Sequence, residues 1–371
     1  MHIFLPLPLL LLSTAQAALL PRQTASQTTS SASASPTACN NHASLCSRSY
    51  SNITHLGAHD SPFLRNSSSN SGFGLSDAGN QNIDSLAQLS AGVRLLSAQI
   101  HKSDNALHLC HTSCSLLDAG LLRDWLSSIK GWLDSHTSDV VTLVLVNSDN
   151  VAATDLASEF VASGISTYGY TPSTAGQWPT LQAMISANTR LVTFVASLPQ
   201  SSGYLLNEFD YLFENPYNNT AASSFTCAAD RPVAQPASAA IATGKLPLLN
   251  HFLYQTMTLG STVIESPDTA SIGTTNAATG TGSLGDFAAA CAKDYGGKAP
   301  WGLLVDYFDQ GDTLKVVDDL NGVANDQATG RQEAGGTKMF TGAAGPAVRL
   351  PTNIKVAGAA LATAVAGWLV V

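Results

Sequence analysis

The chain has 371 residues, of which 44% are hydrophobic and only 12% are charged, whereas a typical soluble domain carries about 25% charged residues. This composition excludes a charge-rich disordered protein and leaves enough apolar residues for a large core. The 26 acidic residues outnumber the 17 basic ones, which gives a formal net charge of −9. Because the sequence contains no basic run, we expect no nucleic-acid partner.

The N-terminus has the pattern of a secretory signal. Residues 2–12 form a short apolar run, and a small-x-small cleavage site follows at 15–17. The alternative is a buried N-terminal helix, but Pro6 and Pro8 would break it. We therefore predict a signal peptide over residues 1–17.

The segment after this signal is rich in Ser, Thr and Ala. Such a composition cannot bury a core, so we predict a disordered, O-glycosylated stalk over 18–38. The patterns described below favour a single folded domain over 39–328, followed by a linker over 329–355.

The C-terminus ends in an uncharged apolar tail, residues 356–371. A polar spacer with Arg349 and Lys355 precedes it, and a run of small residues begins at Gly342. This layout is typical of a GPI-attachment signal, so we predict attachment near Gly342 and a location on the outer cell surface. A plain tail anchor is the alternative, although the tail is shorter than the roughly 20 apolar residues of a membrane-spanning helix.

The six cysteines agree with export, since an even number in an exported chain indicates disulfides. Six cysteines allow fifteen pairings; proximity favours Cys39–Cys46 and Cys110–Cys114, which leaves Cys227–Cys291. A zinc site is disfavoured because no C-x2-C pair is present. Three N-glycosylation sequons, at Asn52, Asn66 and Asn218, fit the same compartment.

Apolar runs bounded by polar residues recur along the rest of the chain and predict eight strands. In chain order they are 53–58, 93–100, 106–110, 140–146, 191–196, 204–213, 246–254 and 301–308. The run 140–146 is continuously apolar, which is typical of a strand buried on both faces of a parallel sheet.

Helical spacing of apolar residues lies between several of these runs. The clearest pattern covers 118–135, with Asp118 as its predicted N-cap. Weaker patterns predict helices over 80–90, 153–163, 180–188, 283–294 and 312–320.

Alternating strands and helices favour an α/β fold of the (β/α)8 barrel type. An open doubly wound sheet is the alternative, but no glycine-rich phosphate loop follows any predicted strand. The segments 216–244 and 255–282 show little periodicity and are predicted as long loops at the barrel mouth or its flanks.

In such a barrel, functional residues collect at the C-terminal ends of the strands. His59 and His111 are expected to face the same mouth, where two histidines suit general acid–base chemistry near neutral pH. His108 is predicted to point outward. The other polar residues near strand ends are predicted to bind substrate: Gln99, His101, Asn147, Asp149, Glu214, Asn250 and His251.

Four short motifs occur in order at these strand ends. They are Gly57-Ala-His-Asp-Ser61, Gly92-Val-Arg94, Leu109-Cys-His111 and Leu303-Leu-Val-Asp-Tyr307. Together they resemble the phosphatidylinositol-specific phospholipase C superfamily, above all its secreted fungal PLC-like phosphodiesterase branch. The resemblance extends from about Cys39 to about Val323.

The resemblance implies a barrel that cleaves phosphodiesters with a pair of histidines. His59 matches the family's first catalytic histidine, a general base, and His111 matches the second, which protonates the leaving oxygen. Asp306 matches the acidic residue that orients the first histidine, and Asp60 lies beside that histidine.

The second predicted strand departs from the family pattern. Bacterial relatives carry an arginine there and eukaryotic signalling relatives carry two calcium-binding carboxylates, whereas this chain has Ser97 and Gln99. Neither residue brings a positive charge, so a large electrostatic contribution is missing. His101 shares a strand face with Gln99 and, when protonated, is the expected substitute; Lys102 is a second candidate. We expect no metal or other cofactor, because the strand offers no carboxylates.

The leading hypothesis for function is a phosphoric diester hydrolase that acts on a phospholipid or a GPI-type head group. The alternative is a catalytically silent, GPI-anchored surface glycoprotein that retains the barrel. A glycosidase would need two carboxylates at strand ends, and the pairing of Glu214 with Asp149 is the only one that the sequence offers. No protein partner is implied.

Overall fold

The computed structural model describes residues 37–65, 78–173, 176–259 and 262–334, which belong to one compact unit that begins at Pro36. Several predictions concern residues outside these ranges. They are the signal peptide, nearly all of the stalk, the sequon at Asn66, the attachment site at Gly342 and the tail 356–371. None of the helices in the described ranges is both long enough and apolar enough to cross a membrane.

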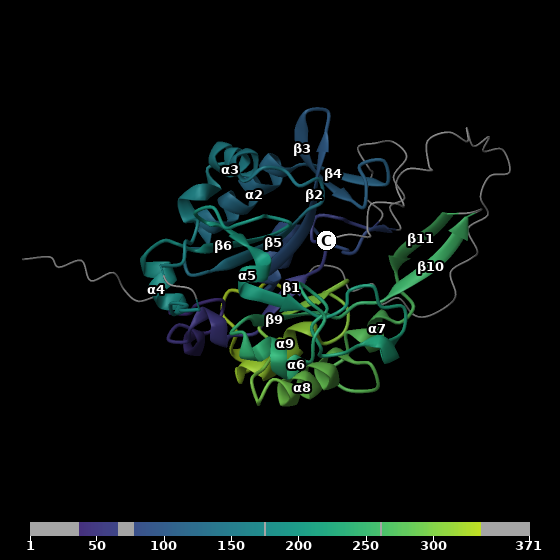
Figure 1. The fold of residues 1–371 in the computed structure, drawn as a ribbon. Coiled ribbons are helices and arrows are strands. Elements are labelled where there is room, and N and C mark those ends of the chain that lie inside the picture. The colour runs from purple at the N-terminus through teal and green to yellow at the C-terminus, as the bar shows by residue number, and fades with distance from the viewer. Residues whose placement is uncertain (1–36, 66–77, 174–175, 260–261, 335–371) are drawn as a thin grey trace, which may run out of the picture. The chain divides into compact units, whose positions relative to one another are not determined.

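Eight parallel strands form a strongly curled sheet (Figure 1). Their order is β7 (Leu205–Asn207), β6 (Leu191–Ala196), β5 (Val141–Asn147), β2 (Leu95–Ser103), β1 (His55–Ala58), β12 (Gly302–Val305), β9 (Leu246–Asn250) and β8 (Leu212–Glu214). The short helix α5 (Glu208–Tyr211) connects the two outermost strands, β7 and β8. The fold is therefore a (β/α)8 barrel, as predicted, with its seam between β7 and β8.

Helices surround the sheet and bury their apolar faces against it. They are α1 (Ser85–Ala91), α2 (Leu122–Ser135), α3 (Ala153–Ala162), α4 (Leu181–Ser186), α6 (Ala237–Ala242), α7 (Ile272–Thr275), α8 (Leu284–Asp294) and α9 (Thr313–Asn321). In Figure 1, α2 and α3 lie on one side of the sheet, and α6, α8 and α9 lie on the other. In α2, residues Leu122, Leu126 and Ile129 are fully buried, as the helical spacing predicted.

The prediction that Asp118 caps this helix is wrong. Asp118 lies in β4 (Leu117–Leu121), and the helix begins only at Leu122, after an N-cap without a side-chain hydrogen bond. The Asp118 carboxylate instead contacts His108 Nδ1 at 3.1 Å, on the neighbouring strand. Asp118 therefore belongs to a strand pair, whereas the local spacing of apolar residues predicted a helix cap.

Two of the predicted barrel strands need correction. The run 106–110 becomes β3 (Ala106–His111), which is antiparallel to β2 and pairs with β4 outside the barrel. Asp104 and Asn105, both with positive φ, make the two-residue turn of this hairpin. The run 204–213 supplies two barrel strands, β7 and β8, because α5 interrupts it. The barrel therefore has eight strands, as predicted, but not the same eight segments of the chain.

The segment 255–282, predicted as a loop, contains regular structure. Strands β10 (Tyr254–Leu259) and β11 (Thr262–Pro267) pair antiparallel as a separate two-stranded sheet. Figure 1 shows this hairpin projecting from the barrel.

Side-chain alternation along the strands separates a barrel interior from a helix-facing layer. Leu95, Val144, Phe194, Leu206, Leu212, Leu248 and Leu304 pack with Tyr50 and Trp301 inside the barrel. Their neighbours in sequence, such as Leu96, Leu143 and Leu249, pack against the helices. Two or four residues further along several of these strands, the inward positions near the C-terminal ends are polar. The mouth of the barrel is therefore polar, and the interior below it is apolar.

All three favoured disulfides are present: Cys39–Cys46, Cys110–Cys114 and Cys227–Cys291. The first lies at the start of the domain. The second closes the end of β3, and the third ties the loop after β8 to α8.

Candidate functional site

His59 follows β1 directly and faces the barrel interior. Its neighbour across the sheet is Asp306, because β1 and β12 pair in register through Ala58 and Val305. The Nδ1 atom of His59 lies 2.8 Å from Oδ1 of Asp306, and Asn80 Nδ2 donates to the same oxygen at 3.0 Å. With Nδ1 donating to the carboxylate, Nε2 is left as the basic nitrogen that faces the mouth.

Asp60 stands between the two histidines. Its Oδ2 lies 3.7 Å from His59 Nε2 and 3.5 Å from His111 Nε2. The backbone of Asp60 has φ of 47°, and its N–H donates to Ser97 Oγ at 2.8 Å. Gln99 Nε2 donates to Oδ2 at 2.7 Å. A non-glycine residue in this left-handed conformation is costly, and β2 holds it there through Ser97 and Gln99.

His111 reaches the mouth in a different way from the other residues. It is the last residue of β3, so it arrives on a hairpin strand that runs back toward the barrel. Phe63 packs against its ring edge-on, with centroids 5.4 Å apart. Its Nδ1 is buried without a hydrogen-bond partner, and the Cys110–Cys114 bridge closes the chain around it.

The electrostatics of the two histidines differ in direction. Burial favours the neutral form of His59, but the negative charges of Asp60 and Asp306 outweigh burial and raise its pKa above 6.5. Burial dominates at His111 and lowers its pKa, despite the attraction of Asp60. His59 is therefore the stronger base of the pair and His111 the stronger acid.

A second polar cluster lies in the same mouth, at the ends of β8 and β9. Glu214 and Asn250 continue the inward alternation of these strands, and Asn250 Nδ2 donates to Glu214 Oε2 at 2.8 Å. Arg231 Nη2 donates to the same oxygen at 2.5 Å. The charge of Glu214 contributes to the raised pKa of His59, so both clusters belong to one electrostatic environment.

The family model described as PI-PLC X 1 matches residues 45–321. The chain belongs to the PI-PLC X family.

A PI-PLC X domain-containing protein 1 from Arthroderma benhamiae is 36% identical over 327 residues, which cover 86% of this chain and 97% of that protein. An uncharacterized secreted protein from the same fungus is 34% identical over 305 residues, covering 79% of this chain and 66% of that protein. Among solved structures, the phosphatidylinositol-specific phospholipase C from Listeria monocytogenes aligns with a TM-score of 0.46 at 15% identity, covering 74% of this chain and 95% of that one.

The structure of this PI-PLC X domain thus brings together His59, Asp60, His111 and Asp306, all of which the sequence singled out. Gln99 joins them through its hydrogen bond to Asp60. Asn80 was missed, because the sequence assigned it to a predicted helix over 80–90, whereas that helix, α1, begins only at Ser85. Phe252, which stacks on His59 with centroids 3.8 Å apart, was missed because an apolar residue after a strand looks like core.

His101 and Asp149 form a separate pair. His101 Nδ1 lies 3.4 Å from Asp149 Oδ1, and the other carboxylate oxygen accepts the backbone N–H of Lys102 at 2.6 Å. Among the described residues, no recorded contact joins this pair to His59, Asp60 or His111. The proposed glycosidase pairing of Asp149 with Glu214 also finds no support, because each carboxylate is engaged in its own cluster.

The remaining candidates have structural roles. The Asn147 amide closes the loop after β5 by two hydrogen bonds to Val151, at 2.8 and 2.9 Å. His251 alternates with Asn250 and is fully buried outside the mouth, with Nε2 at 3.0 Å from the carbonyl oxygen of Thr275. Burial lowers the pKa of His251 to about 4, so it is neutral at physiological pH.

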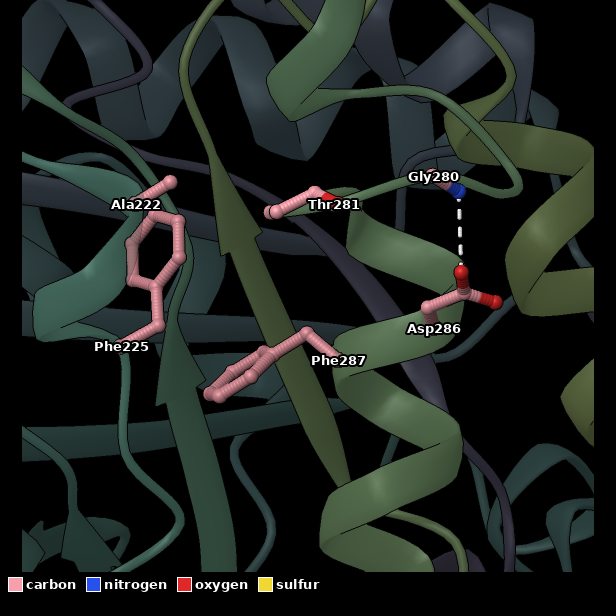
Figure 2. Close-up of a pocket in the computed structure, with 7 residues that line it drawn as sticks. Ala222, Phe225, Gly280, Thr281, Asp286 and Phe287 are labelled. Atoms are coloured by element: carbon pink, nitrogen blue, oxygen red, sulfur yellow. Dashed lines mark hydrogen bonds between the residues drawn. The ribbon is translucent and has the colours of Figure 1, made fainter.

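The ring of His251 stacks on Phe225 and lies close to Phe287, with centroid distances of 4.1 and 5.0 Å. Both phenylalanines line a shallow pocket of about 480 Å³. Figure 2 shows them beside Ala222, with the Gly280 N–H donating to Asp286 at the far end. No residue of the histidine pair lines this pocket, so it is separate from the candidate active site.

The structure bears on the other sequence predictions only in part. His108 alternates with the core residues Leu107 and Leu109, is partly buried, and hydrogen-bonds through Nδ1 to the Asp118 carboxylate. The side chains of Asn52 and Asn218 are exposed, which leaves both sequons open to glycosylation. The described residues contain no group of three or more His, Cys, Asp or Glu side chains arranged to hold a metal ion.

Proposed function

We propose that the chain is a phosphoric diester hydrolase that acts on a phospholipid or GPI-type head group. The observation that carries the proposal is the pair of histidines whose Nε2 atoms lie 3.7 and 3.5 Å from one oxygen of Asp60. Membership of the PI-PLC X family supports the reaction class. A phosphodiester needs one group on each side of phosphorus, and two histidines that face a shared carboxylate can supply them.

In the proposed reaction, His59 Nε2 accepts the proton of the attacking hydroxyl group, and that oxygen forms a bond to phosphorus. The bond between phosphorus and the leaving oxygen breaks, and His111 gives its proton to the departing alkoxide. Asp306 keeps the His59 ring in the tautomer with a basic Nε2 and stabilises the imidazolium that forms. Asp60 stabilises the protonated form of His111.

The pKa shifts agree with the roles of His59 as the base and His111 as the acid. They disfavour, however, the protonation state in which the reaction starts, with the proton on His111. A raised pKa makes His59 a stronger base once it is deprotonated, and a lowered pKa makes His111 a stronger acid once it is protonated. In the free protein, however, a single proton resides mainly on His59. A bound phosphate next to His111 favours transfer of charge to that histidine, which produces the reactive state.

The proposal includes location. A signal peptide over 1–17 would direct the chain to the secretory pathway, and three disulfides in the structure fit an oxidising compartment. A relative is named a secreted protein. Attachment of a GPI anchor near Gly342 would then keep the enzyme at the outer face of the membrane, next to its lipid substrate.

A head-group release assay on the purified protein tests the proposal. Vesicles of phosphatidylinositol, of phosphatidylcholine and of a GPI-anchored reporter are compared for the wild type, His59→Ala and His111→Ala. We expect turnover on at least one substrate and a loss of about 10²- to 10⁴-fold in each variant. Absence of turnover by the folded wild type on all three would instead favour the silent surface glycoprotein.

A further inference from the structure

Hydrolysis of a phosphodiester requires a positive charge near the phosphate, and β2 cannot provide it. Ser97 Oγ accepts the N–H of Asp60 at 2.8 Å. Both ends of the Gln99 amide are also committed, because Nε2 donates to Asp60 and Oε1 accepts the N–H of Thr112 at 2.9 Å. These two side chains therefore position Asp60 and His111 rather than bind an anion.

The substitutes that the sequence offered on the same strand are unsuitable. The Nδ1 atom of His101 lies 3.4 Å from the Asp149 carboxylate, so this side chain is already engaged by an acidic group. The Lys102 side chain is 59% exposed and its Nζ lies 4.0 Å from Asp155. Both side chains contact acidic residues outside the histidine pair, so the positive charge has to come from another strand end at the mouth.

Arg231 comes from the loop between β8 and α6, and its backbone closes one edge of the barrel seam. Arg231 pairs as an isolated antiparallel bridge with Glu214, the last residue of β8. The Glu214 N–H donates to the Arg231 carbonyl at 3.0 Å, and the Arg231 N–H donates back at 3.2 Å. This pairing fixes a cation at the C-terminal end of a barrel strand, on the same rim as His59.

The guanidinium of Arg231 is anchored, but some of its N–H donors lack hydrogen-bond partners. Nη2 donates to Glu214 Oε2, and the guanidinium carbon lies 4.7 Å from the centre of the Tyr217 ring. Nε is buried and has no hydrogen-bond partner. Because a buried donor on a charged group is costly to leave unpaired, an arginine in this state is suited to an additional acceptor.

The balance of charge at this end of the mouth permits an anion. Glu208, in α5 directly before β8, is buried, and burial together with the Glu214 charge raises its pKa well above the usual range, which favours its neutral form. Glu214 is the only carboxylate recorded within 4.0 Å of Arg231 among the described residues. A single carboxylate leaves most of the donors of the guanidinium fork available.

The cluster is also coupled to the histidine pair. The charge of Glu214 helps to raise the pKa of His59. Burial, and after it the charges of Asp306 and Asp60, raise the pKa of Tyr254, and Tyr217, over which the guanidinium stacks, contributes in the same direction. Because β8 stands four places from β2 in the strand order, Arg231 reaches the mouth from the side opposite β2.

We propose that Arg231, oriented by Glu214, is the residue that binds the phosphate group of the substrate in this protein. The inference rests on the proposed function for its role in turnover, but the binding of phosphate can be measured without turnover. The recognised chemistry is a phosphate anion whose oxygens accept N–H groups of a planar guanidinium, a geometry that Arg provides better than Lys.

Binding of inorganic phosphate to the purified protein, followed by calorimetry and by ³¹P NMR, is the primary test. We expect Arg231→Gln to weaken binding about 10- to 100-fold, the range for loss of a charged hydrogen bond. Arg231→Lys should recover part of the affinity, because the charge returns without the fork. Arg123→Gln is the matched control, since Arg123 also pairs with a glutamate but at the surface between α2 and α3.

A second variant separates binding from folding. Arg231→Gln alone leaves Glu214 buried without its partner and can destabilise the protein. In Arg231→Gln/Glu214→Gln both charges are removed, and the melting temperature is recorded for each protein. We expect the double variant to remain folded and still to bind phosphate weakly. Wild-type affinity in the folded double variant would overturn the proposal.

The outcomes distinguish the inference from the proposed function. Phosphate binding that depends on Arg231 in a wild type without turnover would support the inference and contradict the proposed function. Turnover with unchanged KM and kcat in Arg231→Gln would support the proposed function and contradict the inference. Arg65 is the other arginine to compare, because its Nη1 donates to the hydroxyl of Tyr307, next to Asp306, at 3.4 Å. Loss of phosphate binding in Arg65→Gln but not in Arg231→Gln would assign the cation to Arg65 and overturn the inference, as would a wild type that binds no phosphate.

Discussion

The imidazole of His59 lies flat on the ring of Phe252, with centroids 3.8 Å apart and planes inclined by 8°. The contact joins the end of β1 to the segment after β9. It covers one face of a histidine side chain that is only 13% exposed, so it both restricts the ring and keeps water from it.

We expect Phe252→Ala to raise the pKa of His59, because burial is the largest influence that now lowers it. The change should also destabilise the fold by about 3–5 kcal/mol, as loss of a buried phenylalanine does. An NMR titration of the histidine resonances measures the first effect and denaturant unfolding the second. Phe225→Ala, which removes the ring stacked on His251, is the control and should leave the His59 titration unchanged.

The dependence of kcat/KM on pH should be bell-shaped. At low pH both histidines are protonated and His59 cannot act as a base; at high pH both are neutral and His111 cannot act as an acid. Since Asp306 helps to raise the pKa of His59, Asp306→Asn should lower that pKa and move the alkaline limb to lower pH. An alkaline limb that stays in place would show that Asp306 does not control His59.

The Cys110–Cys114 bridge should matter for turnover more than for stability. Its cysteines are four residues apart, so the chain-entropy model assigns it about 2 kcal/mol, against about 4 kcal/mol for Cys227–Cys291, which are 64 apart. Replacing Cys110 and Cys114 by serine should lower kcat by loosening His111, with a small change in melting temperature. Replacing Cys227 and Cys291 should mainly lower the melting temperature. Mass spectrometry of the non-reduced protein checks the pairing, and free thiols at 110 and 114 would contradict it.

Chelation should leave the activity unchanged. The inward residues of β2 are Ser97 and Gln99, which lack the carboxylates that calcium prefers, and Asp60 and Asp306 are already engaged by histidines. The head-group assay is repeated with EDTA and with added calcium. Activity that EDTA abolishes and calcium restores would require ligands elsewhere in the chain.

A chain that ends at residue 342 should be released into the medium, whereas the full chain should stay on the cell surface. The reason is the loss of the apolar tail that the GPI-attachment machinery recognises. Fractionation of expressing cells measures the distribution, and treatment of the full-length form with a GPI-cleaving phospholipase is the positive control. Equal retention of both forms would contradict GPI anchoring.

The sequence by itself determined the architecture and the residues of the candidate site. The apolar run 140–146 and the helical spacing in 122–133 depend on contacts between neighbours along the chain, so they predict β5 and α2 correctly. His59, Asp60, His111 and Asp306 were found because each stands at or near the end of an apolar run, and the ends of parallel strands meet at one rim. The disulfides followed from proximity along the chain for two pairs and from elimination for the third.

Tertiary structure decided the partners of these groups, because partnership depends on which strands are neighbours. Strand β3 is as apolar as a barrel strand, yet the turn at Asp104 and Asn105 folds it back on β2 and delivers His111 from outside the barrel. His101 has the right spacing for the mouth, but its Nδ1 lies 3.4 Å from Asp149 and contacts that carboxylate instead of the histidine pair. Arg231 carries no sequence signal, since it lies in an irregular loop, and only the pairing of its backbone with Glu214 places its charge at the rim of the barrel.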